Sequence, residues 1–404
     1  MAGLNQLSVA VIGGGIGGAS AALSLLARGA DVRIYEQARR LAEVGAGIQI
    51  SPNASRILHA LGLERALAAI GVRPQAVEYR RWQDGRLIAR YAMGDAVERA
   101  FGAPYFHLHR AEFLDMLVRA LPTERIHLGR RCVGVDRQGP RPVVRFADGS
   151  KAEADLVVGA DGIHSAVRSA LFGAEAPVYS GAVAYRGLVP AETIASLDLE
   201  VISTTWFGPG RHLVAYYVAG RRFLNIVACV RQAEWTGESW TEACSPNEVR
   251  AAYAGWNGTV RALVGAIEQT FKWGLFHRLP LPRWSEGAVT LLGDSCHPML
   301  PYMAQGAAQA IEDGAALAAC LAAEADVPAA LALYEDLRRA RTARVQQMSL
   351  VNADMFQLPD GAEQDCRDVR LAAASRPPLG DWLYAHDARS TDVRAAGVRP
   401  PEAQ

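Results

Sequence analysis

The segment GDSCHPMLPYMAQGAAQAIEDG at residues 293–314 brings an acid, a histidine, two prolines and a glycine-led helix start into one short run. An apolar strand pattern ends at Asp294, where a carboxylate can accept hydrogen bonds from the hydroxyl groups of a polyol chain. Pro298 and Pro301 stiffen the loop that follows. The small-residue pattern from Gly306 predicts a helix whose first N–H groups can face an anion. The segment therefore predicts a site that holds hydroxyl groups and negative charge close together.

His297, in the same segment, suggests a second interpretation, because a histidine near an acid is part of the Ser-His-Asp triad of hydrolases. The sequence contains no G-x-S-x-G nucleophile elbow, which argues against that chemistry. We therefore expect His297 to be structural, with its ring hydrogen-bonded within the loop.

A second chemical motif lies near the N-terminus, where LSVAVIGGGIGGASAALSLL reads as a strand, a glycine turn and a helix. Gly13, Gly15 and Gly18 have the G-x-G-x-x-G spacing. The first permits a tight turn, the second lets the backbone approach a pyrophosphate, and the third lets helix and strand pack closely. A second strand, Val32–Tyr35, ends in Glu36, where an acid can accept hydrogen bonds from ribose hydroxyls. The pattern predicts a cofactor that contains ADP, without deciding between NAD and FAD.

A third motif, ADLVVGADGIHSAVRSALF at residues 154–172, reads as an apolar strand that ends at Gly159, an Asp161-Gly162 turn and a helix. An Asp-Gly pair at the end of a strand can give a carboxylate and a close backbone approach to a bound cofactor. The alternative is an ordinary turn before a helix capped by Ser165, and this motif alone favours the alternative.

In this order, the three motifs resemble those of the single-component flavoprotein aromatic hydroxylases, the group with the para-hydroxybenzoate hydroxylase fold. GAGIQISPNA, YSGAVAYRGL, RHLVAYYV and ALYEDLRRARTARVQ extend the resemblance over residues 8–350. Within the group, the chain is most similar to salicylate hydroxylase, 3-hydroxybenzoate 6-hydroxylase and 6-hydroxynicotinate 3-monooxygenase. The resemblance implies bound FAD, NADH or NADPH as a transient reductant, and O2 as a co-substrate. The implied reaction is hydroxylation of a small hydroxylated aromatic acid through a flavin C4a-hydroperoxide, chemistry that belongs to the cofactor.

The resemblance also implies cofactor contacts, position by position. Glu36 would hold the adenosine ribose, and Asp294 the ribityl chain. Arg110 would reach the central part of the cofactor, although a surface or salt-bridge role is its alternative. The N–H groups of Gly306 and Ala307 would stabilise negative charge at the N1–C2=O edge of the reduced flavin. The complete expected set is Gly13, Gly15, Gly17, Gly18, Glu36, Gln37, Gln49, Arg110, Asp161, Asp294, Gly306, Ala307 and the backbone near Cys132, which would meet the adenine.

The substrate pocket is expected around the run RHLVAYY, because a strand there places His212, Val214 and Tyr216 on one face. The histidine and the phenol could orient a substrate hydroxyl and help to ionise it. The alternative is that both are ordinary buried or edge residues of a sheet. The expected catalytic set is His212, Tyr216, Tyr302, Gln49 and Pro301, whose carbonyl would border the flavin.

Departures from the resembling enzymes bear on the substrate. Hydroxynicotinate hydroxylases carry histidines where this chain has Gln49 and Tyr302, and 3-hydroxybenzoate 6-hydroxylases carry one where it has Ala215. An aromatic hydroxy acid of the salicylate or hydroxybenzoate type therefore leads, and an N-heteroaromatic such as a hydroxynicotinate is the alternative. Arg186 could bind a carboxylate. The rival functions are an FAD-dependent reductase or oxidase on the same fold, and a flavin-binding protein without catalysis.

The resemblance implies an α/β fold with a discontinuous, Rossmann-like FAD-binding domain at residues 1–75, 100–175 and 285–350. Residues 76–99 and 176–284 should form an inserted antiparallel-sheet domain that covers the substrate. Within it, RHLVAYYVAGRRFLNIVACV reads as two strands joined by a hairpin at residues 219–221. Residues 351–404 should be a C-terminal helical extension that ends in a tail.

The composition limits the partners and the location. The chain of 404 residues can bury a large core, and 42 Lys and Arg residues balance 42 Asp and Glu residues. We expect no nucleic-acid partner, because the arginines do not cluster. The six cysteines form no CxxC pair, which predicts reduced thiols, no metal and a cytoplasmic location. We expect no membrane partner, because no run approaches the length needed to span a bilayer. A monomer or a homodimer is expected.

Overall fold

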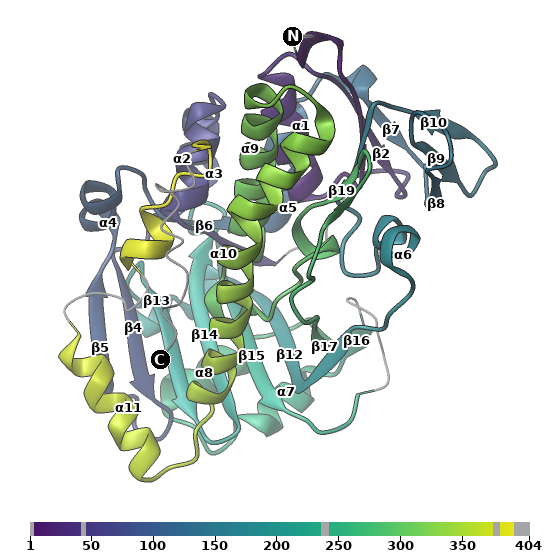
Figure 1. Ribbon diagram of the computed structural model, residues 1–404. Coiled ribbons are helices and arrows are strands. Elements are labelled where there is room, and N and C mark those ends of the chain that lie inside the picture. Colours follow the sequence, from purple (N-terminus) through teal and green to yellow (C-terminus); the bar gives the residue numbers. More distant parts are fainter. Residues whose placement is uncertain (1–3, 42–45, 236–241, 375–379, 392–404) are drawn as a thin grey trace, which may run out of the picture.

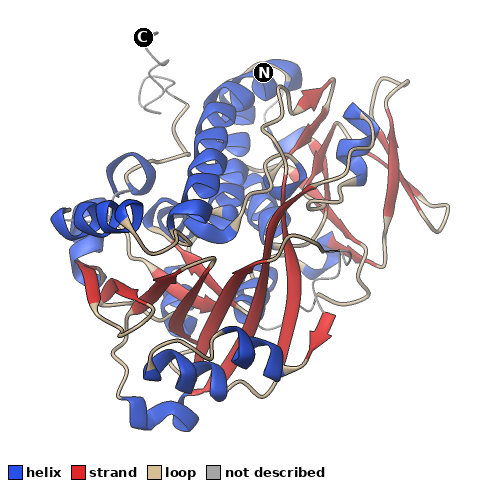
Figure 2. Cartoon of the chain, turned by 90° about the horizontal axis from the view of Figure 1, so that it is seen from below, coloured by secondary structure: helices blue, strands red, loops and turns tan. Residues whose placement is uncertain are grey.

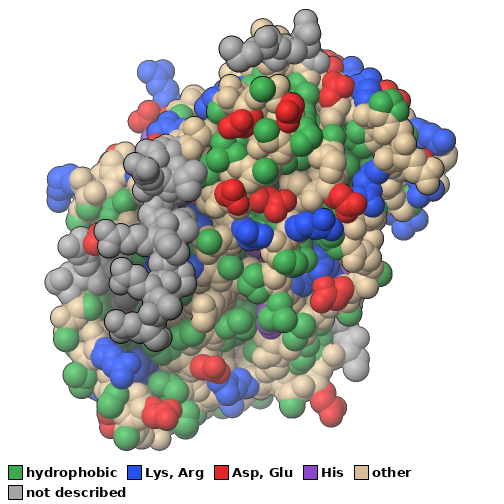
Figure 3. Space-filling model, viewed as in Figure 1, with side chains coloured by type: hydrophobic (Ala, Val, Ile, Leu, Met, Phe, Trp, Pro, Cys, Tyr) green, Lys and Arg blue, Asp and Glu red, His purple; other side chains and the backbone are tan. Residues whose placement is uncertain are grey.

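The computed structural model describes residues 4–41, 46–235, 242–374 and 380–391, which form the two lobes seen in Figure 1. Residues 392–404, the last part of the extension and tail expected at residues 351–404, lie outside the described residues. The expected α/β class is confirmed. Figure 3 shows acidic and basic side chains intermixed on the face of the molecule that it presents.

The first lobe is built on a six-stranded sheet with the order β18-β19-β11-β1-β2-β7. The central strand β1 (Ser8–Ile12) pairs in parallel with β2 (Asp31–Glu36) and with β11 (Leu156–Gly159). Parallel strands are buried on both faces, which explains why these segments are continuous apolar runs. The outer strands are β7 (Ile126–Leu128), β19 (Val289–Leu291) and β18 (Ser285–Glu286).

Helices α1 (Ile16–Leu26) and α9 (Gly306–Ala323) pack closely against each other beside this sheet. Their small residues permit this approach, since a Cβ added at Gly314 would lie 2.7 Å from the Cα atom of Ala21. The lobe also contains α2 (Pro52–Ala60), α3 (Glu64–Ile70), α5 (Arg110–Arg119), α6 (Ala166–Phe172), the strand pair β3 (Gly47–Ile50) and β6 (Phe106–His109), and the small sheet of β8 (Cys132–Asp136), β9 (Val143–Phe146) and β10 (Lys151–Glu153).

The second lobe is built on an eight-stranded sheet with the order β16-β17-β12-β15-β14-β13-β4-β5. Its pairs are antiparallel except for the parallel pair of β13 and β4. The strands are β4 (Ala76–Arg81), β5 (Leu87–Ala92), β12 (Val178–Pro190), β13 (Ser203–Gly208), β14 (Arg211–Val218), β15 (Phe223–Arg231), β16 (Glu242–Cys244) and β17 (Thr270–His277).

One face of this sheet packs against helices α7 (Pro246–Ala252) and α8 (Gly258–Gly265) around a second apolar core that includes Leu213 and Ile226. Figure 2 shows helices on the side of the large sheet that faces away from the long helices of the first lobe. The opposite face is therefore the one that meets the first lobe. Helices α4 (Gly94–Phe101) and α11 (Ala362–Ala373) complete this part of the chain. The short helical turns are Leu4–Gln6, Thr123–Arg125, Ala191–Leu197, Gly293–Ser295, Pro301–Met303 and Gly380–Tyr384.

The expected hairpin joins β14 to β15. Ala219, Gly220 and Arg221 all have positive φ values, 52°, 61° and 72°, as a tight turn between paired strands requires.

Helix α10 (Val327–Met355) runs along both lobes (Figure 1). Leu331 and Tyr334 belong to the core of the first lobe, whereas Leu350 and Ala353 pack beside the large sheet. The domain boundary expected at residue 350 therefore falls inside a continuous helix that ends at Met355.

Candidate active site

A cavity of about 640 Å³ extends from the start of α1 to the inner face of the eight-stranded sheet. This volume lies within the range of small-molecule sites, roughly 300–1,000 Å³. Gly15, Arg110, Asp294 and Gly306 line it toward the first lobe. Toward the second lobe, the cavity is lined by five residues that were expected from the sequence: His212, Tyr216, Tyr302, Pro301 and Gln49.

The glycine turn before α1 has the form of a phosphate cradle. Gly13 has a φ of +108°, and a Cβ at Gly18 would lie 1.9 Å from the carbonyl oxygen of Gly13, so both positions require glycine for the turn itself. A Cβ at Gly15 would meet no protein atom within 4 Å. Gly15 is also the N-cap of α1 and provides no side-chain cap for the free N–H groups. The open space and the free donors fit a pyrophosphate.

Glu36 ends β2 beside this turn. Its carboxylate accepts hydrogen bonds from the backbone N–H groups of Gly14 at 2.7 Å and Ala38 at 2.8 Å. These bonds fix the carboxylate at the strand end, and its remaining lone pairs can accept hydrogen bonds from ribose. Of the expected cofactor residues, Gly13, Gly18, Glu36, Gln37, Cys132 and Asp161 are not among the described residues that line the cavity.

Asp294 lies in the turn after β19, and its side chain is exposed to the cavity although protein surrounds it. Burial raises the pKa of this carboxyl, and the nearby charge of Arg110 opposes the rise. Arg110 begins α5 and also lines the cavity. An acid and a guanidinium on one wall fit the hydroxyls and the phosphates of a dinucleotide.

The carboxylate of Asp161 lies at the start of α6. It accepts hydrogen bonds from the hydroxyl of Ser165 and from the N–H groups of Ala166 at 2.7 Å and Val167 at 3.2 Å. Ser165 in turn caps α6 by accepting a hydrogen bond from Arg168 N. The carboxylate of Asp161 thus helps to cap α6, and the cofactor contact expected of this residue stays a prediction. The neighbouring Gly162 lines the cavity.

His297 is buried, and its ring contacts an acid of α9 rather than a partner within the loop. Its Nε2 lies 2.5 Å from Oδ2 of Asp313, and its ring packs against Trp284 with 5.3 Å between the ring centroids. Cys296, His297 and Asp313 have ligand atoms within 4.8 Å of one another, as in a metal site. However, Nε of Arg338 donates to Asp313 at 2.8 Å, so a cation already compensates this acid.

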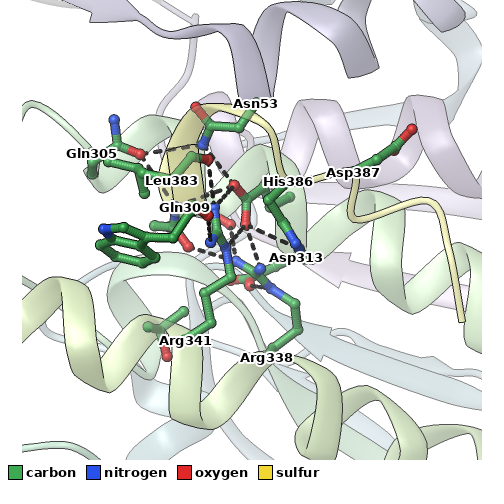
Figure 4. Close-up of polar contacts among 12 residues, drawn as sticks. Asn53, Gln305, Gln309, Asp313, Arg338, Arg341, Leu383, His386 and Asp387 are labelled. Atoms are coloured by element: carbon green, nitrogen blue, oxygen red, sulfur yellow. Dashed lines mark hydrogen bonds and ion pairs between the residues drawn. The ribbon is translucent and has the colours of Figure 1, made fainter. Parts of the chain in front are cut away.

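Sequence reasoning missed a buried charged network on α9 (Figure 4). Glu312 accepts hydrogen bonds from Asn53 at 2.6 Å and from Arg341 at 2.7 and 2.8 Å, and it also pairs with Arg338. Asn53 donates in addition to Gln305, the N-cap of α9. The network therefore fixes the start of α9, where Gly306 and Ala307 line the cavity. The signal in the sequence was the pair of acids inside a helix of small residues.

At the end of the cavity expected to hold the substrate, the floor is formed by paired residues of β13, β14 and β15. His212, Val214 and Tyr216 alternate along β14 and line the cavity. On one side, β15 places Cys229, Val227 and Asn225 opposite them, and on the other side β13 places Phe207, Thr205 and Ser203. Tyr302 and Phe356 also line the cavity and pack against His212, with ring centroids 5.2 Å and 5.3 Å from that of the histidine.

His212 is a neutral hydrogen-bonding group in this floor. The amide nitrogen of Gln357 lies 3.1 Å from its Nδ1. An amide nitrogen can only donate, so Nδ1 accepts and the ring proton resides on Nε2. Burial lowers the pKa of His212 to about 3. Sequence reasoning did not find Gln357, which reaches the site from the end of α10.

Two further groups lie near this floor. Burial raises the pKa of Tyr216 to about 12, so its phenol stays protonated and can donate a hydrogen bond. Arg186 of β12 lines the same cavity, with its guanidinium carbon 4.1 Å from the centroid of the Trp273 ring. A stacked, planar guanidinium is suited to bind a carboxylate.

The fold and the site define a flavoprotein with one dinucleotide cradle and a sheet-covered cavity. The chain matches the FAD binding domain family over residues 6–349 and belongs to that family. It is 42% identical to 3-amino-4-hydroxybenzoate 2-monooxygenase of Streptomyces cremeus over 98% of this chain and 99% of the relative. It is also 42% identical to 6-hydroxynicotinate 3-monooxygenase of Pseudomonas fluorescens, over 84% and 90% of the two chains.

Solved structures agree with these relatives. A substrate complex of salicylate hydroxylase matches with a TM-score of 0.82 and 29% identity, over 99% of this chain and 100% of that one. The protein HpxO of Klebsiella pneumoniae, complexed with FAD and uric acid, matches with a TM-score of 0.81 and 27% identity, over 90% and 92% of the two chains. The chain is thus an FAD-dependent aromatic monooxygenase that uses NAD(P)H and O2, as the motifs predicted.

Two further properties can be read from the described residues. None of their helices is long and apolar enough to cross a membrane. All six cysteines are free thiols.

Proposed function

We propose that this monooxygenase hydroxylates a small benzoate that carries a phenolic hydroxyl, of the type represented by salicylate and the aminohydroxybenzoates. The observation that carries the proposal is the arrangement of three polar groups around an apolar floor: His212 and Tyr216 on β14, and Arg186 on β12. The relatives named for 3-amino-4-hydroxybenzoate are similar over nearly the whole chain, which supports the same class of substrate.

The register supports a ring lying on Val214 and Val227. The Cα atoms of residues two apart in a strand are about 7 Å apart. Those of His212 and Tyr216 are therefore about 13 Å apart, with Val214 between them. Val227 lies opposite both Val214 and Arg186, so it separates the guanidinium from β14. A benzoate on this apolar surface would have donors at its edges, because His212 Nε2, the Tyr216 hydroxyl and Arg186 all donate hydrogen bonds.

The residues of this chain have distinct tasks in such a reaction. When bound, FAD supplies the oxygen-transfer chemistry. Tyr216 would donate to an ionised substrate hydroxyl, and the ionised oxygen makes the ring more electron-rich. His212 would donate at another edge of the ring. The N–H groups of Gly306 and Ala307 would stabilise negative charge at the adjoining cofactor. Tyr302 and Phe356 would exclude water from the reacting ring.

The test is a panel of 3-amino-4-hydroxybenzoate, salicylate, 3-hydroxybenzoate and 6-hydroxynicotinate with the FAD-loaded enzyme. We expect NAD(P)H oxidation coupled to product that contains isotopically labelled oxygen from O2, with a benzoate as the best substrate. Reduction without label in any product would support the reductase or oxidase alternative. No substrate-stimulated NAD(P)H oxidation would support a flavin-binding protein without catalysis.

A hydroxynicotinate is the second candidate, because 6-hydroxynicotinate monooxygenases are as similar in identity as the aminohydroxybenzoate enzymes. Gln49 and Tyr302 argue against it, since the resemblance places histidines at these positions in hydroxynicotinate enzymes. The same panel separates the two, because preferential turnover of 6-hydroxynicotinate would contradict the benzoate proposal.

We further propose a cytoplasmic location, which the six free thiols support. We also propose that the chain works as a monomer or a homodimer without a nucleic-acid or membrane partner. Size-exclusion chromatography with light scattering on the FAD-loaded protein tests the oligomeric state.

A further inference from the structure

The segment Gly380–Ala388 contributes to the cavity from beyond the residues that match the family. That match ends at residue 349, yet Tyr384 lines the cavity together with Gln49 and Tyr216. The ring of Tyr384 packs edge-on against Phe101, at 5.6 Å between centroids, and against Tyr105 at 6.0 Å. The C-terminal segment is thus part of the wall of the site.

Two arginines hold this segment in place. Arg341 donates hydrogen bonds to the carbonyl oxygens of Trp382 at 3.0 Å and Leu383 at 2.9 Å, and Glu312 fixes the same guanidinium from α9. Figure 4 shows Arg341 and Leu383 in this buried network. On the other side, Arg56 donates to the carbonyl oxygen of His386 at 2.6 Å. The backbone on both sides of Tyr384 is therefore anchored.

Four polar side chains lead from Tyr384 to the substrate floor. The ring of Tyr384 lies edge-on to that of Tyr105. The hydroxyl of Tyr105 donates to Oε1 of Gln49 at 2.6 Å. Gln49 in turn lines the cavity together with Tyr216. The hydroxyl of Tyr216 lies over Gly47 at the cavity wall, since a Cβ at Gly47 would come within 2.7 Å of it.

The hydrogen bond from Tyr105 to Gln49 limits what the groups on either side of it can do. A phenol has one hydrogen, and that of Tyr105 is used on Gln49, so Tyr105 can only accept from Tyr384. Because Oε1 of Gln49 accepts from Tyr105, its NH2 group is the one that can face Tyr216 and donate to the phenol oxygen. The single hydrogen of Tyr216 is then left for a group inside the cavity.

We propose that Tyr384 and Tyr105 are positioning residues that orient Gln49, and thereby make the Tyr216 hydroxyl a hydrogen-bond donor to an anionic oxygen of the substrate. This inference rests on the proposed function, because it requires a substrate with an ionisable hydroxyl. It assigns the C-terminal segment a role in substrate recognition. It also means that the substrate ring must carry a hydrogen-bond acceptor, rather than a donor, at the edge that faces Tyr216.

The test uses the full-length, FAD-loaded protein and 4-hydroxy-3-nitrobenzoate, an analogue of the aminohydroxybenzoates whose phenolate absorbs visible light. At one pH near the probe's own pKa, the wild-type protein should bind a larger fraction of it as phenolate than exists in solution. Tyr384→Phe and Tyr105→Phe should both lower the bound phenolate fraction and weaken binding about 5-fold, the effect of losing one hydrogen bond. Tyr216→Phe should lower both quantities further.

Tyr91→Phe is the matched control, because it removes a buried phenol that donates to Leu371 O at 2.6 Å and does not line the cavity. FAD content and melting temperature show whether each variant is folded. If Tyr384→Phe and Tyr105→Phe retain the wild-type phenolate fraction while Tyr216→Phe loses it, the positioning role is overturned and the proposed function stands. If the folded wild-type protein does not bind the probe, the benzoate proposal is overturned and this inference with it.

Discussion

The amide nitrogen of Gln357 lies 3.1 Å from Nδ1 of His212, and this contact fixes which ring nitrogen of the histidine carries its proton. The donor that remains, Nε2–H, belongs to a ring whose other neighbours are Tyr302 and Phe356. A histidine held in this way is a hydrogen-bond donor to substrate rather than a base that gains and loses charge.

The first prediction concerns the pH dependence of this histidine. Burial lowers the pKa of His212 to about 3, so we expect no limb of the profile of kcat/KM between pH 5 and 8 to belong to it. In Gln357→Glu, an adjacent carboxylate favours the charged ring and should raise the pKa of His212. A new limb should therefore appear in the pH profile of kcat/KM. Gln357→Met removes the amide without adding charge and serves as the control. A wild-type limb that disappears in His212→Asn would contradict the prediction.

Tyr216→Phe should retain FAD and lower the fraction of NAD(P)H oxidation that leads to hydroxylated product. The lost hydrogen bond would go to a charged oxygen, and such bonds contribute about 1.5–3 kcal/mol. We therefore expect kcat/KM to fall roughly 10-fold or more. Tyr217→Phe is the matched control, since the neighbouring residue faces the opposite side of the sheet. Product and hydrogen peroxide are measured in parallel, and full coupling in Tyr216→Phe would remove this residue from the site.

Arg186→Met should weaken the binding of substrates that carry a carboxylate. Its guanidinium is stacked on Trp273 and lines the cavity, where it can pair with an anion. KM for a hydroxybenzoate should rise more than 10-fold, whereas the binding of the parent phenol without the carboxylate should change little. Equal weakening for both ligands would show that Arg186 supports packing rather than carboxylate recognition.

Two glycine substitutions should distinguish an effect on FAD binding from an effect on the stability of the fold. In Gly15→Ala, the new methyl group meets no protein atom, so the melting temperature of the protein without FAD should be almost unchanged while FAD affinity falls. In Gly18→Ala, the methyl group would lie 1.9 Å from Gly13 O, so the fold itself should be destabilised. Thermal denaturation and FAD titration distinguish the two. Normal FAD affinity in Gly15→Ala would contradict the assignment of the cradle.

Glu312→Gln should destabilise the protein by about 3–5 kcal/mol, because it leaves Arg338 and Arg341 buried without their common partner. Burial alone would raise the pKa of Glu312, but the charges of Arg341 and Arg338 outweigh it and hold the pKa well below its usual range.

The sign of the pH effect follows from this lowered pKa. The stabilisation from Glu312 is complete above its unfolded pKa of about 4.3 and is lost as the pH falls toward the folded value. The stability of the wild-type protein against urea should therefore fall below about pH 5, and that of Glu312→Gln should depend less on pH. The same acid sensitivity in both proteins would assign the effect to other groups.

The parts of the site that depend on local backbone were predictable from the sequence. The strand, glycine turn and helix around Gly13 follow from short-range sterics, as does the hairpin at residues 219–221, and the alternation along β14 places His212 and Tyr216 on one face. Each of these features needs only a few consecutive residues.

The choice of partners was not predictable, because it depends on how distant segments pack. His297 has Asp294 three positions away in the sequence, yet it contacts Asp313 on the next helix. Asp161 follows a strand in the manner of a cofactor ligand, yet its carboxylate is satisfied by the start of α6. Gln357 contacts His212 and Tyr384 lines the cavity, yet both belong to segments whose sequences carry no recognisable motif.

The alternation along β14 has a consequence for how such enzymes diverge. Cavity-facing positions are interleaved with the outer-core positions Leu213 and Ala215, so inserting or deleting one residue would exchange the two sets and would disturb the cavity and the core together. A point substitution at His212, Val214 or Tyr216 changes one position of the floor and leaves the outer core intact. New ring preferences on this scaffold should therefore arise by single replacements in strands of constant length rather than by remodelling of loops.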